Sequence, residues 1–285
     1  MKSCNLRARA TFSLQERMAA IAIAVALLSP ARNLMADEIN VFGQETGSDG
    51  AMMGILYDLK QTQDHKLTWV NPVSYYLVVD EFLSKKWDES VLNRYYRVSR
   101  PLYTTQIFIP TMAADAAPKA FNAENKVKPS LWIVHYKAQV SPPEDGTYRF
   151  VGSADDMLAV AINGKTVLSA PLFDPQGAHL PLTKWITPEP GGILGLDFGN
   201  LVNGDWIQLK KDDAVDLDVI IGECPGGLFS AFLLIEKQGG HYQQDASHHA
   251  ILPIFQVAPY DTPPPASPRW APPFAKGYPP WRSYQ

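Results

Sequence analysis

The 285-residue chain has little charge, few cysteines and no long hydrophobic run. Charged residues make up 19% of it, below the quarter that is usual in globular domains, which argues against a coiled coil. The formal net charge of −4 provides no basic surplus, so we expect no nucleic-acid partner. A hydrophobic content of 46% with 11% aromatic residues is still enough for a core, which excludes a disordered or collagen-like chain.

The motifs of common catalytic sites are also missing. The sequence contains no Gly-x-Ser-x-Gly elbow, no P-loop and no His-Glu-x-x-His motif. Its carboxylates are numerous enough to leave a two-carboxylate glycoside hydrolase open, although their spacing singles out no pair. We therefore expect a non-enzyme, with a glycoside hydrolase as a third possibility. The acidic residues in question are Glu144, Asp145, Asp155, Asp156, Asp197 and Asp205.

Residues 1–36 have the pattern of a secretory signal peptide. A basic region precedes the short apolar run from Met18 to Leu28, and small residues follow, with cleavage expected after Ala36. The run is too short for a membrane span, so we expect no transmembrane segment in the mature chain, and an uncut N-terminal anchor is the alternative. Cleavage removes five of the 25 bases and one of the 29 acids, which moves the formal charge to −8. The expected location is secreted, periplasmic or at the cell surface.

The two cysteines do not predict a disulfide. Cys4 leaves with the signal peptide, so the mature chain keeps only Cys224. Cys224 lies in an apolar-flanked turn, where a small buried residue is expected more than a reactive thiol.

The first part of the mature chain predicts a strand followed by a helical insertion. A turn and a compact apolar run lie within residues 41–58, which indicates the strand. Apolar residues then recur at three- and four-residue spacing after Asn71 and Pro72, which predicts an amphipathic helix with a cap. A second short helix is expected over 88–95, so the insertion covers about residues 72–96.

Beyond Pro101 the sequence predicts short strands separated by turns. A strand is expected over 106–109, ended by Pro110, and the alanine-rich stretch 111–123 is expected to be a loop. Further strands are expected over the ranges 131–140, 148–151, 158–162, 165–168, 206–209, 214–221 and 229–236. Asn163-Gly164 joins two apolar runs and predicts a hairpin. The fold class is therefore mainly β, an antiparallel sandwich or barrel.

The composition changes at Pro259. Nine of the last 27 residues are proline, and aromatic residues lie between them. We expect an extended Pro-rich tail over 259–285, either disordered or docking onto a partner. Removal of the signal peptide and the tail leaves 37–258 as one domain.

One constellation carries a family resemblance. Pro143 to Gly146, Tyr148 and Phe150 precede a Ser153-x-Asp155-Asp156 turn, and the Asn163-Gly164 hairpin follows. Over residues 41–237 the chain resembles the β-barrel domain of anthrax protective antigen, the PA-fourteen family, most closely within 131–169.

The resemblance implies a ligand site. In carbohydrate-binding members, mainly adhesins, the Asp-Asp pair binds calcium and the ion bridges sugar hydroxyls. This implies Asp155 and Asp156 as calcium ligands, with Asn203 or Asn200, and Asp205 beside the ligand. The alternative is that the two carboxylates only cap backbone donors.

The leading hypothesis is thus a secreted, non-enzymatic binding module, with calcium-assisted glycan binding or surface adhesion. The alternative is a structural envelope or assembly subunit that binds a protein through its tail or helical insertion. The stretch Asp245 to His249 has zinc-type ligands, but adjacent histidines point apart, and a solvated loop is expected there.

Overall fold

The computed structural model describes residues 40–47, 50–171, 201–246, 248–264 and 271–284. The signal peptide expected at residues 1–36 lies outside them. The described residues form the helices and strands α2 Pro72–Ser84, η1 Leu92–Arg94, α3 Ala116–Ala120, β1 Met52–Asp58, β2 Tyr96–Arg97, β3 Leu102–Thr104, β4 Phe108–Ala113, β5 Trp132–Ser141, β6 Gly146–Asp155, β7 Met157–Ile162, β8 Lys165–Pro171, β9 Val202–Asn203, β10 Ile207–Leu209, β11 Val215–Glu223, β12 Leu228–Lys237 and β13 Arg282–Tyr284.

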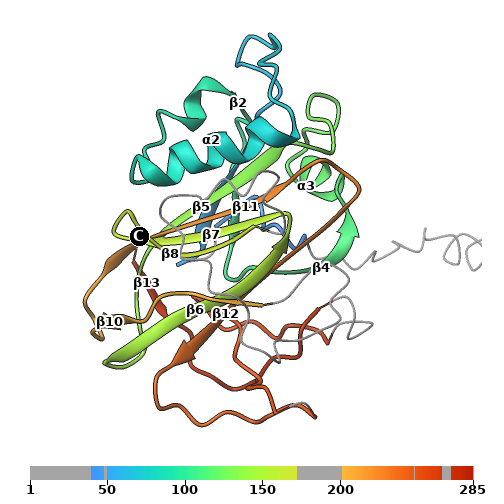
Figure 1. Cartoon of the computed structure of the whole chain (residues 1–285). Coiled ribbons are helices and arrows are strands. Elements are labelled where there is room, and N and C mark those ends of the chain that lie inside the picture. The colour runs from blue at the N-terminus through green and yellow to red at the C-terminus, as the bar shows by residue number, and fades with distance from the viewer. Residues whose placement is uncertain (1–39, 48–49, 172–200, 247, 265–270, 285) are drawn as a thin grey trace, which may run out of the picture. The chain divides into compact units, whose positions relative to one another are not determined.

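Two antiparallel sheets form a sandwich, as expected from the short apolar strands (Figure 1). The eight-stranded sheet has the order β2-β1-β5-β11-β7-β8, with β3 beside β1 and β13 beside β5. The five-stranded sheet has the order β10-β6-β12-β4, with β9 beside β6. Among the described strands the two sheets stay separate, so the barrel alternative does not apply. Asn163 and Gly164, both at positive φ, connect β7 to β8 as the predicted hairpin.

Apolar side chains fill three layers. The main core lies between the sheets and contains Trp132, Phe150 and Phe229. A second cluster packs α2 onto the outer face of the eight-stranded sheet through Tyr75 and Phe82, among others. A third cluster packs the segment around 252–254, with Ala271, onto the five-stranded sheet. The helical insertion and the C-terminal segment therefore cover opposite faces of the sandwich (Figure 1).

The predicted helix begins as the sequence indicates. The Asn71 side chain accepts from the backbone N–H groups of Val73 and Ser74, both at 3.0 Å, and the Ser74 hydroxyl accepts from the Asn71 N–H at 2.8 Å. This reciprocal capping box fixes the start of α2, with Pro72 in the first turn. The second predicted helix, over 88–95, is wrong in extent, because only the 3₁₀ turn η1 forms there.

Two expectations for residues 106–123 are wrong. β4 continues through Pro110 to Ala113, and α3 forms where a loop was expected. β4 is an edge strand with an irregular register opposite Phe229 to Ala231, and such a position tolerates a residue without an N–H. Pro118 lies in the first turn of α3, where its missing N–H removes no helical hydrogen bond.

The C-terminal segment packs against its own chain. β13 pairs with residues 139–141 of β5, and the Trp281 side chain is 3% exposed. Its ring lies among those of Tyr148, Phe150 and Phe255, with centroid separations of 5.3 to 5.9 Å. Trp281 thus belongs to the core, whereas Tyr260 and Tyr278 of the same tail are exposed.

Candidate functional site

The Asp155-Asp156 turn connects the two sheets. Asp155 ends β6 and pairs with Ser230 of β12, whereas the Asp156 N–H donates to the Gly222 carbonyl of β11 at 3.0 Å. The peptide bond between the two aspartates is cis. Both residues are only 6% exposed, so the turn places two adjacent carboxyls inside the protein.

The end of β11 surrounds this turn with further polar groups. The Cys224 N–H donates to Asp156 Oδ2 at 2.7 Å. Glu223 is 1% exposed, and its Oε2 atom has no hydrogen-bond partner in the described part of the chain. A buried carboxyl oxygen without a partner is costly, which marks this cluster as incompletely satisfied.

Burial raises the pKa of all three carboxyls. Desolvation raises the pKa of Asp155, and the neighbouring Asp156 carboxyl raises it further by charge repulsion and by accepting its proton in a hydrogen bond. The pKa of Asp156 is also raised by burial, against the lowering effect of the Cys224 N–H and the Asp155 proton. Burial and the two aspartates raise the pKa of Glu223 to about 9. The surroundings of the three carboxyls therefore stabilise their negatively charged forms less well than water does.

The donor set at the turn suits a hard cation. Calcium takes six to eight oxygen ligands, and two adjacent carboxylates supply several of them. Within the described ranges, no three His, Cys, Asp or Glu side chains are grouped so that they hold an ion by themselves. An ion at this turn would thus take Asp155 and Asp156 and complete its shell with carbonyl, water or ligand oxygens.

The other implied ligands lie elsewhere or outside the described residues. Asn203 pairs with Val151 on β6, four residues before Asp155, which is about 13 Å along a strand. Asp205 is exposed, and its N–H donates to the Val167 carbonyl. Asn200 is outside the described residues. The structure therefore brings Asp155 and Asp156 together but does not bring Asn203 or Asp205 beside them.

The site also contains residues for which no sequence motif predicts a functional role. Glu223 directly precedes Cys224, and Tyr75 and Tyr76 belong to the apolar face of α2. Burial of Tyr76 and, more weakly, the charges of Asp156, Cys224 and Asp155 raise the pKa of its phenol. The tyrosines carry a helical apolar spacing, so their sequence signal was that of a core residue.

The histidine stretch forms a local turn. His249 Nδ1 lies 3.1 Å from Asp245 Oδ2, and the His249 N–H donates to Asp245 Oδ1 at 2.9 Å. These contacts are between residues four apart and agree with the loop expected there.

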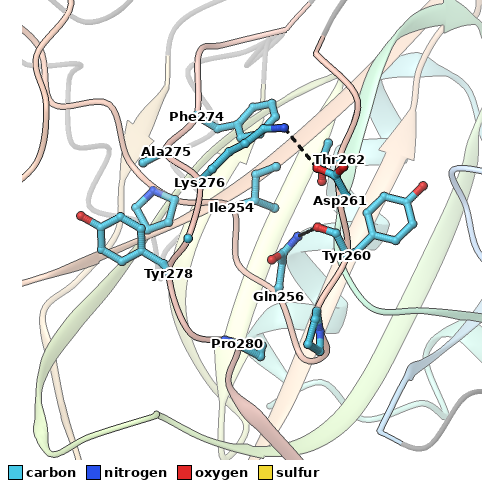
Figure 2. A pocket seen from close by; sticks show the side chains of 13 residues that line it. Ile254, Gln256, Tyr260, Asp261, Thr262, Phe274, Ala275, Lys276, Tyr278 and Pro280 are labelled. Carbon is cyan, nitrogen blue, oxygen red and sulfur yellow. Dashed lines mark hydrogen bonds and ion pairs between the residues drawn. The ribbon is translucent and has the colours of Figure 1, made fainter.

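A hollow of about 370 Å³ lies in the C-terminal segment (Figure 2). Its two walls are residues 259–262 and 274–280, with Ile254 and Gln256 between them. The Lys276 ammonium and the Asp261 carboxylate form an ion pair of 3.1 Å across it. The Gln256 amide donates to the Tyr260 carbonyl at 3.2 Å. The Lys276, Asp261 and Gln256 side chains drawn here thus each have a polar partner within the hollow.

Comparisons with known proteins give only remote structural likenesses. No protein-family model matches the sequence, and no curated protein matches it. A PA14 sugar-binding domain from an RTX adhesin is similar with a TM-score of 0.39 and 14% identity, over 70% of this chain and 97% of that one. The PA14 domain of the antifreeze protein MpAFP has a TM-score of 0.38 and 13% identity, over 67% and 83%.

A third similar structure is the epithelial adhesin 6 A domain from Candida glabrata in complex with Galb1-3GlcNAc. Its TM-score is 0.37 with 12% identity, over 70% of this chain and 85% of that one. With TM-scores below 0.5, these likenesses leave the function to be argued from the residues of this chain. No helix among the described residues is long and apolar enough to span a membrane.

Proposed function

We propose that this protein is a secreted, non-enzymatic binding module that takes calcium at the Asp155-Asp156 turn. The observation that supports the proposal is the group of three buried carboxyls, Asp155, Asp156 and Glu223. The carboxyls of Asp155 and Asp156 are adjacent and buried, and Glu223 keeps a buried oxygen without a hydrogen-bond partner among the described residues. A divalent cation would displace the protons that the raised pKa values of these carboxyls favour, and it would take the oxygen ligands that calcium prefers.

The bound ion would also contact the partner molecule. Bound calcium with open coordination positions supplies an electrostatic contact for hydroxyl groups, so we propose a glycan at the cell surface as its partner. Asp155 and Asp156 would hold the ion, and the turn between β6 and β7 would orient it.

Calorimetric titration with calcium tests the ion. After chelator treatment, the wild-type chain should bind one calcium ion, and Asp155→Asn should weaken binding at least tenfold because one carboxylate ligand is lost. The control is Asp64→Asn, an exposed aspartate in the turn before α2, which should bind like the wild type. The absence of heat and of a thermal shift in the wild type would refute the calcium site.

A glycan array tests the partner. Glycan binding in the presence of calcium should disappear when a chelator is added and in the Asp155→Asn variant, but it should persist in Asp64→Asn. Equal glycan binding with and without chelator would show that the glycan does not bind through the ion.

The second candidate function is assembly with a protein through the helical insertion. Four apolar side chains in and before α2 are exposed, with Trp69 at 82% and Leu77 at 55%. The other two are Leu67 and Val73. The tail is less suited to this role, because Trp281 is engaged in its own core.

Retention in envelope fractions tests this candidate. Trp69→Ala should reduce retention if the insertion is the docking surface, because an exposed aromatic side chain provides much of the contact area. Trp206→Ala is the control, since Trp206 is 39% exposed on the five-stranded sheet. Equal retention of both variants and the wild type would refute this candidate.

A further inference from the structure

Helix α2 begins directly over the carboxyl cluster. The Cys224 thiol lies 3.7 Å from the Pro72 carbonyl, to which it donates, and the Tyr75 hydroxyl donates to the Trp132 carbonyl at 3.3 Å. The Tyr75 hydroxyl also occupies the space beside Gly222, where an added Cβ would lie 2.0 Å from it. The first turn of α2 is therefore seated on residues 222–224.

The same short segment holds the aspartates. Gly222 accepts the Asp156 N–H, and the Cys224 N–H donates to the Asp156 carboxylate. In this structure Asp155 and Asp156 are each only 6% exposed, which leaves no open face for an ion that also binds a glycan.

We propose that the first turn of α2 is a gate over the Asp155-Asp156 turn, and that calcium and glycan reach the carboxylates only when this turn moves away. The inference rests on the calcium site of the proposed function. The described structure is the closed state. If only the open state binds, the apparent affinity is reduced by the fraction of molecules that are open.

The capping box controls this gate. Asn71, Pro72 and Val73 are exposed, and the start of the helix depends on the hydrogen bonds between Asn71 and Ser74. Local opening starts where backbone hydrogen bonds are exposed, as they are from Asn71 to Val73, whereas Tyr75 in the same turn is fully buried. Loss of an N-cap side chain shifts a helix equilibrium about fivefold.

Asn71→Ala therefore opens the gate without touching the carboxylates. Two quantities are measured in parallel on the wild type and the variant: the rate of maleimide alkylation at Cys224, read by mass spectrometry of its peptide, and the dissociation constant for calcium. Both should change about fivefold, with faster alkylation and tighter calcium binding. Ser74→Ala, which removes the reciprocal bond, should change both in the same direction.

The control is Asp145→Ala, which also removes a side chain that accepts from a backbone N–H, here that of Lys211 at 2.8 Å. It should leave both quantities unchanged. Faster alkylation with an unchanged calcium dissociation constant would overturn the gate and leave the calcium site standing. No calcium binding by any variant or by the wild type would overturn the calcium site and the gate together. If neither capping variant accelerates alkylation, α2 does not cover Cys224 and the gate is wrong.

Discussion

Single residues determine the acid-base behaviour of the cluster. Asp155 and Asp156 were identified from the sequence, because a paired-carboxylate turn is visible as a motif. Glu223 was not, since its position depends on β11 pairing with both β5 and β7. A residue becomes part of a site of this kind through long-range pairing, which local sequence patterns do not encode.

The raised carboxyl pKa values give a pH dependence with a defined sign. Glu223 faces Asp155, Asp156 and the Cys224 thiol, and its pKa is about 9 in the folded state. Between the ordinary range of a glutamate, near 4.5, and about 9, the folded chain holds a proton that the unfolded chain has lost. The stabilising effect of that proton is complete below the ordinary range and is lost as the pH rises toward 9.

We therefore predict that the free energy of unfolding falls between pH 5 and pH 9 without calcium, and that the fall is smaller in Glu223→Gln. Each unit of pKa difference corresponds to about 1.4 kcal/mol. Urea denaturation at several pH values measures this. Glu89→Gln is the control, because Glu89 is only partly buried and its hydrogen bond to Lys137 lowers its pKa. An equal fall in wild type and Glu223→Gln would contradict the prediction.

At the scale of elements, the sequence predicted what local patterns encode. The capped helix, the Asn163-Gly164 hairpin and most strands follow from spacing and turn residues, whereas the continuation of β4 past Pro110 and the helix α3 were not predicted. Proline usually ends a strand or helix, but it is tolerated in an edge strand and in the first turn of a helix. Pro110 and Pro118 lie at these two kinds of position. The placement of α2 over the Asp155-Asp156 turn was not predictable, because no local pattern specifies which face a helix covers.

The contact between α2 and β11 provides a prediction at this scale. Gly222→Ala places a Cβ 2.0 Å from the Tyr75 hydroxyl and 2.8 Å from the Trp132 carbonyl. Overpacking of this kind costs about 1–3 kcal/mol, so the variant should unfold at lower urea concentration. Adding Tyr75→Phe removes the closest atom and should restore part of the loss. A double variant no more stable than Gly222→Ala would show that the helix is not what the new methyl meets.

At the scale of the whole molecule, the C-terminal segment packs onto the sandwich. Three clusters pack the insertion, the two sheets and the residues Leu252, Ile254, Ala271 and Phe274 on one another. The composition of the tail predicts an extended chain but does not show where it lies. Aromatic residues in a proline-rich stretch fit a partner or the chain's own core equally well by sequence.

Trp281→Ala should destabilise the protein by about 3–5 kcal/mol, because it removes a buried ring from a cluster of three other aromatic residues. Thermal unfolding and limited proteolysis should show a lower midpoint and cleavage after residue 259. Trp206→Ala, on a partly exposed ring, should have a much smaller effect. Equal effects of the two substitutions would mean that Trp281 does not hold the segment in place.

The pairing of β13 with β5 also determines when the protein can fold during its synthesis. Trp281 packs on Tyr148 and Phe150, which are made more than a hundred residues earlier. The inter-sheet core therefore stays incomplete until residue 281 has been made. We expect the sandwich to fold only after that point, and the unfinished sandwich must be kept from aggregating until then.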